Sequence, residues 1–171
     1  MRSALASRPL GRQPVAHADV VPAASVVAAS ALAMLPIVSS SGWWPNTGLL
    51  MLIAWRLLRA DAWPAWWAAP LGFVNDLLTG MPIGLSVSLW AAIMLVMDLV
   101  DRRTQWRGYL IEWGVACLLI AFAGWVEWEV AVLAGATVPM AQVVPALIVE
   151  MLVFPIAALL VARIDRWRLG R

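Results

Sequence analysis

The stretch GFVNDLLTGMPIGLSVSLW, residues 72–90, is apolar over most of its length but carries an amide and an acid, Asn75 and Asp76, in its first third. Glycine and proline interrupt helices, so the run TGMP at residues 79–82 predicts a tight turn between two helices. An acid in such surroundings requires a partner, because an unpaired charge is costly in an apolar medium. The stretch therefore predicts a helical hairpin with a polar group near its turn.

The polar residues before the turn fall on one side of the predicted helix. With about 100° of rotation per residue, the small and polar side chains share one arc, and the larger apolar side chains take the opposite side. We therefore expect the arc to face protein. Asp76 either caps the start of the following helix or bonds hydroxyls in the bundle, or else it contacts a partner or lines a polar cavity. The members of the arc are Gly72, Asn75, Asp76, Thr79 and Gly80.

The composition of the whole chain is that of an integral membrane protein. Of its 171 residues, 63% are hydrophobic and 13% are charged, whereas soluble domains average about 45–50% and about 25%. A bilayer core of roughly 30 Å requires about 20 helical residues per crossing, so the chain has room for about six crossings and for little else. Glycine, proline and charged residues delimit six apolar segments, which are residues 20–38, 47–60, 64–80, 82–100, 108–135 and 140–163.

The positive charges alternate along the chain. All twelve basic residues are arginines, and they lie before the first apolar segment or at the ends of the second, fourth and sixth. Because positively charged loops are retained in the cytoplasm, this pattern predicts six transmembrane helices with both termini cytoplasmic. We expect residues 1–18 and 165–171 to be cytoplasmic tails and residues 19–164 to form the transmembrane domain. Topology explains the arginines, so we expect no nucleic-acid partner.

Glu150 is a second acid within an apolar segment, in the run PALIVEMLVFP. Counted from the basic ends of their segments, Glu150 and Asp76 lie at nearly the same depth, so they are candidates to approach one another or to share a cavity. Pro145 and Pro155 each leave a helix carbonyl without its usual donor. The alternative is therefore that a protonated Glu150 donates a hydrogen bond to such a carbonyl.

The first apolar segment contains small residues at a regular spacing. Ala24 and Ala28 lie four residues apart in VVPAASVVAASALAML. This spacing allows helix backbones to approach closely, so it favours contact with another helix of this chain or of another protein.

The chain does not supply the residues of a common catalytic or metal site. It contains one histidine, His17, and one cysteine, Cys117, so it can assemble neither a histidine-assisted nucleophile nor a multi-histidine metal site. Asp76 and Glu150 are capable of acid–base work in principle, but nothing in the sequence positions a substrate beside them. We expect no enzymatic activity, no metal and no cofactor.

The hairpin stretch also contains a recognisable pattern, G-x3-D-x3-G-x-P-x-G, which resembles the segment typical of the bacterial rod shape-determining MreD family. The upstream run WWPNTGLLMLIAWRLLRADAWPAW, residues 43–66, is similar to the second span of that family. Length, six spans and scarcity of charge fit over nearly the whole chain, whereas the motifs cover residues 43–90. The residues of the pattern are Gly72, Asp76, Gly80, Pro82 and Gly84.

The resemblance implies a non-catalytic scaffold subunit of the cell-wall elongation complex, in the cytoplasmic membrane of a bacterium. Its implied partners are MreC most directly, the glycosyltransferase RodA and a penicillin-binding transpeptidase, and the MreB filament indirectly. The family is also thought to share its six-helix fold with the substrate-binding subunits of energy-coupling-factor vitamin transporters, which is the alternative function. Those subunits dock a transport partner through small residues of their first helix, a role that Ala24 and Ala28 also suit.

Overall fold

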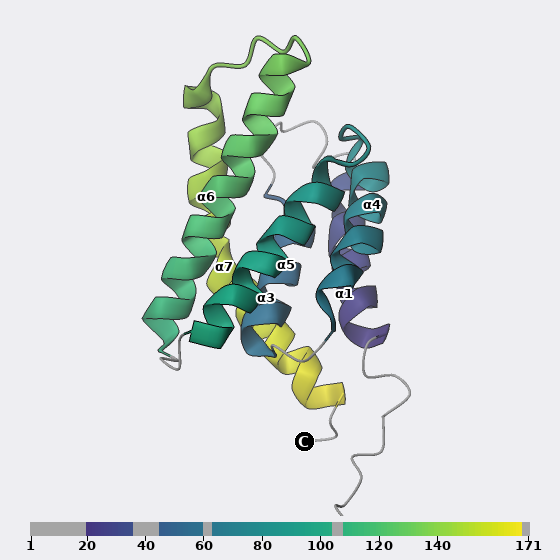
Figure 1. Ribbon diagram of the computed structural model, residues 1–171, viewed down its shortest axis with the longest axis vertical. Coiled ribbons are helices and arrows are strands. Elements are labelled where there is room, and N and C mark those ends of the chain that lie inside the picture. Colours follow the sequence, from purple (N-terminus) through teal and green to yellow (C-terminus); the bar gives the residue numbers. More distant parts are fainter. Residues whose placement is uncertain (1–19, 36–44, 60–62, 104–107, 169–171) are drawn as a thin grey trace, which may run out of the picture.

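The computed structural model describes residues 20–35, 45–59, 63–103 and 108–168, without the side chains of residues 101–103. These residues form helices and no strand (Figure 1). Each of the six predicted apolar segments contains one α-helix, so the all-helical fold is confirmed. The elements are α1 (Val20–Ala31), η1 (Leu32–Met34), α3 (Thr47–Leu58), η2 (Ala65–Trp67), α4 (Ala68–Thr79), α5 (Leu85–Arg103), α6 (Tyr109–Leu133) and α7 (Met140–Arg168).

Two of the helices, α6 and α7, are each long and apolar enough to cross a membrane. The apolar helices α1, α3 and α5 contribute shorter runs. α7 continues through Pro145 and Pro155 and ends at Arg168, so it extends beyond residue 164, where the sequence predicts the start of a tail. The last turns belong to the packed bundle, because Asp165 is buried.

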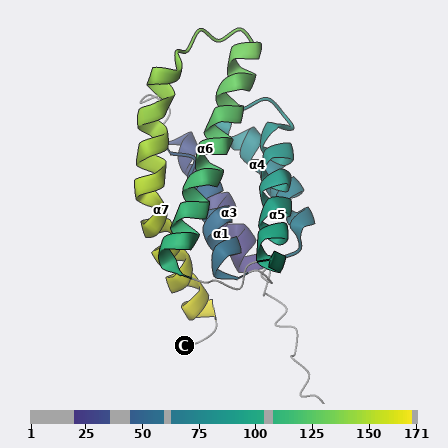
Figure 2. The same ribbon diagram turned by 60° about the vertical axis from the view of Figure 1, so that its left-hand side comes forward.

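Helix α3 lies at the centre of the bundle. Every residue from Gly48 to Arg56 is buried, as expected for a helix that is apolar on all sides. α1 and α7 make the most extensive contacts with α3, α4 packs between α1 and α5, and α6 packs along α7 (Figures 1 and 2). In the part of the chain that the structure describes, α1 and α7 both pack on α3 but make little contact with each other.

The helices alternate in direction, which gathers the basic residues at one end of the bundle. We call this end, where α3, α5 and α7 finish, the arginine end, and the opposite end, which holds the α4–α5 turn and the α6–α7 connection, the hairpin end (Figure 1). The charge alternation in the sequence thus becomes a spatial asymmetry. The arginines at this end, within the described helices and their caps, are Arg56, Arg59, Arg102, Arg103, Arg163, Arg166 and Arg168.

Some of these arginines also join helices to one another. Arg56, which is 4% exposed, forms an ion pair with Asp98 of α5. Arg59, at the end of α3, donates a 2.8 Å hydrogen bond to the Asp165 carboxylate on α7. Arg168 contacts the same carboxylate at 2.8 Å. The arginine end is therefore tied together by charge-assisted hydrogen bonds, which are stronger than neutral ones.

Candidate functional site

The turn between α4 and α5 is built on two glycines with positive φ. α4 ends at Gly80, whose φ of 70° is left-handed, and α5 begins after Gly84, whose φ is 100°. Glycine adopts such angles without steric cost, whereas a Cβ atom does not. Pro82, between them, accepts a 3.0 Å hydrogen bond from the Leu85 amide through its carbonyl. The predicted tight helical hairpin is confirmed, and its connection is residues 80–84.

The carboxylate of Asp76 caps the first turn of α5. Its Oδ1 accepts a 2.9 Å hydrogen bond from the backbone N–H of Ser86, and its Oδ2 accepts a 2.7 Å bond from the N–H of Gly84. The first amides of a helix lack partners within the helix and carry partial positive charge. The buried acid, which is 1% exposed, therefore has two donors, and the expected capping of the following helix is what the structure shows.

Other members of the polar arc also contact α5 at Ser86. The amide Nδ2 of Asn75 donates a 3.0 Å hydrogen bond to Ser86 Oγ. A Cβ atom on Gly72 would lie 2.6 Å from the Ser86 carbonyl oxygen, so only glycine allows this approach. Gly72, Asn75 and Asp76 therefore face protein, as predicted. Thr79 instead donates its hydroxyl hydrogen to the Asn75 carbonyl, 2.7 Å away within its own helix. Gly80 is exposed, so the prediction that the arc faces protein is wrong at this residue, because the chain leaves the helix there.

Nothing in the sequence singled out Ser86, although three residues of α4, Gly72, Asn75 and Asp76, contact it in the hairpin. A serine in the first turn of a helix is a common helix-start signal, but nothing in the sequence indicates which helix supplies its partners.

The side chain of Asn75 also lies close to α3. A Cβ atom on Gly48 would lie 2.9 Å from Asn75 Oδ1 and would collide with Ser30 Oγ of α1. Gly48 therefore lets α1, α3 and α4 pack closely around polar side chains.

Glu150 is held by Asn46 at the start of α3. The backbone N–H of Asn46 donates a 2.7 Å hydrogen bond to Glu150 Oε1, and the Asn46 side chain donates a 3.2 Å bond to Glu127 Oε1 on α6. Asn46 Oδ1 also accepts a 3.1 Å bond from the Leu49 amide, which caps α3. One asparagine thus joins α3, α6 and α7 at the hairpin end.

Neither interpretation of Glu150 included this contact. Its Oε1 accepts a hydrogen bond from a backbone amide, and the hydrogen bonds of Asp76 go to other amides. The roles of Asn46 and Glu127 were not predicted. An asparagine directly before an apolar run is a helix-start signal, but the two acids that meet it come from segments about 80 and 100 residues away.

The paired alanines of α1 lie on its exposed side. Ala24 and Ala28 are exposed, and the face of α1 that packs into the bundle is formed instead by Pro22, Ala23, Val26, Ala29 and Ser30. Contact within the chain therefore uses a neighbouring face of the helix. Ala28 still borders a groove, whereas Ala24 does not.

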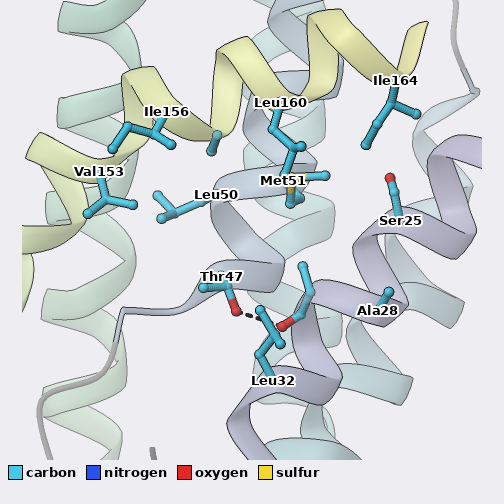
Figure 3. A pocket seen from close by; sticks show the side chains of 12 residues that line it. Ser25, Ala28, Leu32, Thr47, Leu50, Met51, Val153, Ile156, Leu160 and Ile164 are labelled. Carbon is cyan, nitrogen blue, oxygen red and sulfur yellow. Dashed lines mark hydrogen bonds between the residues drawn. The ribbon is translucent and has the colours of Figure 1, made fainter. Parts of the chain in front are cut away.

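The groove lies between α1 and α7, and α3 forms its floor (Figure 3). Its volume is about 400 Å³. The two hydroxyls among its lining residues are turned to protein, because Thr47 Oγ1 donates a 2.6 Å bond to the Ala29 carbonyl and Ser25 Oγ donates a 2.7 Å bond to the Pro22 carbonyl. The lining is therefore apolar. It consists of Ser25, Ala28, Ala29, Leu32, Thr47, Leu50, Met51, Val153, Ile156, Ala157, Leu160 and Ile164.

The polar contacts at these sites join helices to one another. The described acids at the hairpin and at Asn46 accept hydrogen bonds from amides, and among the described residues no group of three or more histidine, cysteine or acidic side chains is arranged to hold a metal ion. Comparison with known proteins yields no match to a protein-family model, to a curated protein or to a solved structure. The functional inference therefore depends on the geometry and on the sequence pattern.

Proposed function

We propose that the protein is a non-catalytic scaffold subunit of the bacterial cell-wall elongation complex, embedded in the cytoplasmic membrane with both termini on the cytoplasmic side. The length and apolar character of α6 and α7 support membrane insertion. The collection of the described arginines at one end supports the orientation, since basic ends are retained in the cytoplasm.

The observation that carries the proposal is the use of the G-x3-D-x3-G-x-P-x-G pattern in the hairpin. Gly72 allows close approach, Asp76 caps α5, and Gly80 and Gly84 supply the two positive φ angles. The hairpin therefore requires these residue types at these four positions of the pattern that resembles the MreD family.

A scaffold must also offer surface to other transmembrane proteins. Outward-facing apolar side chains occur along α5 and α6, and these helices contact each other only sparsely. In a membrane such faces meet lipid or partner helices. We propose MreC as the direct partner, with RodA, a penicillin-binding transpeptidase and, indirectly, MreB in the same complex. Exposed residues on these faces include Leu95, Leu99, Leu110, Leu118 and Phe122.

The alternative implied by the resemblance, a substrate-binding subunit of a vitamin transporter, requires polar groups that orient the ligand within a pocket. The groove between α1 and α7 offers an apolar lining whose hydroxyls are already bonded to backbone carbonyls. This groove is therefore not suited to orient such a ligand.

Depletion in a rod-shaped bacterium that encodes the protein tests the scaffold. We expect depleted cells to lose their rod shape and to regain it when the wild-type chain is expressed. Asp76→Leu should complement poorly, and Leu77→Ala, which alters an exposed neighbour on the same helix, should complement fully. The amount of membrane-integrated protein is measured for each variant. Cells that remain rods after depletion would exclude the proposal.

Affinity capture from native membranes separates the two candidate functions. Recovery of MreC and RodA is the result expected of the scaffold. Recovery of transport ATPase subunits, together with a small molecule that raises the melting temperature, would assign the protein to vitamin transport instead. Asp76→Leu should recover less MreC per folded chain if the hairpin itself forms the contact.

A further inference from the structure

The groove between α1 and α7 follows part of the length of α7. Its α7 wall extends from Val153 to Ile164, which corresponds to roughly 17 Å of helix at about 1.5 Å per residue. Ile164 and Ser25 lie near the arginine end, and Figure 3 shows the side chains of the α7 wall directed toward α3 and α1. The groove thus has a defined direction.

The lining limits the chemistry of an occupant. The Ser25 hydroxyl is bonded to the Pro22 carbonyl and also accepts a 2.7 Å bond from Trp55 Nε1. The Thr47 hydroxyl is bonded to the Ala29 carbonyl. A ligand in the groove therefore meets methyl and methylene groups, so the part of the ligand that enters must be apolar.

The volume limits the shape of an occupant. An α-helix with its side chains is about 10–12 Å across, so a helical segment of roughly 17 Å occupies on the order of 1,500 Å³. Even the total empty space of the groove, including its open mouth, is about 870 Å³, so a helix of this length does not fit within it. A single extended hydrocarbon chain is the slender apolar group that suits this space.

The two ends of the groove differ in charge. At the arginine end, Asp165 follows the lining residue Ile164 and contacts both Arg59 and Arg168. Arg163, directly before Ile164, is exposed. The guanidinium groups of Arg163 and of Arg59, which is 42% exposed, therefore reach the surface at this end. Basic groups at the cytoplasmic side of a membrane attract anionic lipid headgroups.

We propose that the groove binds one acyl chain of an anionic phospholipid, whose phosphate lies against Arg59 and Arg163 at the arginine end. The inference rests on the membrane embedding in the proposed function but is independent of the role in cell-wall elongation. Bound in this way, the lipid bridges α1 and α7, which contact each other little directly.

The test uses the full-length protein, purified in mild detergent and stripped of lipid, with native mass spectrometry as the readout. Phosphatidylglycerol and phosphatidylcholine with identical acyl chains are the probes. We expect one phosphatidylglycerol per chain to bind at a concentration about tenfold lower than phosphatidylcholine. Both lipids carry a phosphate, but only phosphatidylglycerol has a net negative charge, because the choline ammonium of phosphatidylcholine compensates its phosphate and is repelled by the arginines. Equal binding of the two lipids would overturn the assignment of the headgroup.

Two alanines of α1 provide a matched pair of variants. Both Ala24 and Ala28 are exposed and lie one turn apart, but only Ala28 lines the groove. Ala28→Phe should fill the groove and weaken phosphatidylglycerol binding at least tenfold, and Ala24→Phe should leave binding unchanged. Ala157→Phe fills the groove from α7 and should reproduce the loss. Equal binding in Ala24→Phe and Ala28→Phe would overturn the proposal.

The headgroup contact is tested separately. Arg163→Gln should reduce the preference for phosphatidylglycerol without disturbing the Arg59–Asp165 contact, and Arg59→Gln should reduce it further.

The groove could instead hold a second copy of the chain, which is tested with the same variant. A protein dimer that Ala28→Phe dissociates would assign the groove to a second copy and overturn the lipid assignment. Extraction of membranes with alkaline carbonate tests membrane embedding separately from lipid binding. A protein that stays in the membrane but binds no lipid would overturn the lipid site and leave the membrane embedding standing.

Discussion

Asp76 of α4 accepts a 2.9 Å hydrogen bond from the backbone N–H of Ser86 in α5, so an acid from one helix caps the start of the next. A helix is ordinarily capped by the side chain of the residue that precedes it. Here that residue is Gly84, whose carbonyl accepts the amide of Ser88 but which has no side chain to contribute. The glycine permits the turn, and the neighbouring helix supplies the acceptor.

Replacing Asp76 with leucine should destabilise the fold. The substitution leaves the amides of Gly84 and Ser86 without their acceptors, at a cost of about 1–3 kcal/mol for each. Asp76→Asn keeps one carbonyl oxygen, so it should lose about half as much. Unfolding in detergent, followed by circular dichroism, measures both. If Asp76→Leu unfolds like the surface control Leu77→Ala, the cap contributes no stability.

Gly72 and Gly114 form a matched pair for testing close packing. A Cβ atom at Gly72 would meet the Ser86 backbone at 2.6 Å, whereas one at Gly114 meets nothing within 4 Å. Gly72→Ala should therefore destabilise by about 1–3 kcal/mol through overpacking. Gly114→Ala, within α6, should stabilise by up to about 1 kcal/mol because alanine favours helix. The free energies of unfolding of the two variants should thus change with opposite signs, and changes of the same sign would contradict the close approach.

The two glycines of the turn should respond differently to asparagine. Gly80 has a φ of 70°, close to the left-handed region that asparagine tolerates at helix ends. Gly84 has a φ of 100°, outside that region. Gly80→Asn should thus lose less stability than Gly80→Ala, which costs about 1–2 kcal/mol. At Gly84, asparagine and alanine should lower the stability equally. Melting temperatures of the four variants measure this difference. An identical ranking at both positions would argue against the two backbone conformations.

Asn46 allows capping to be separated from its contact with Glu127. Aspartate caps helices as well as asparagine does, but it cannot donate the 3.2 Å hydrogen bond to Glu127 Oε1. Asn46→Asp should therefore be less stable than wild type, and adding Glu127→Gln should restore stability, because glutamine returns a donor. A double-mutant cycle measures the coupling, expected to be about 0.5–3 kcal/mol. Additive effects would mean that the two side chains act independently.

The sequence by itself determined the six helical segments and a tight turn at residues 79–82, which the structure places at residues 80–84. Apolar runs, together with glycine and proline, act over a few neighbouring residues, so their effect on local conformation can be followed along the chain. The separation of polar and apolar faces on α4 follows from helical rotation alone. The alternation of arginines along the chain predicted which helix ends lie together, because basic ends are retained on one side of a membrane.

Contacts between distant segments were decided only by the tertiary structure. Asp76 was expected to cap or to contact a partner, and the position of α5 settled the first role. The contact between Asn46 and Glu150 joins residues 104 positions apart. Neither side chain carries a local signal for the other, because their meeting depends on how α3 and α7 pack. The groove likewise exists because α1 and α7 both pack on α3 but scarcely on each other, and no local pattern specifies that gap.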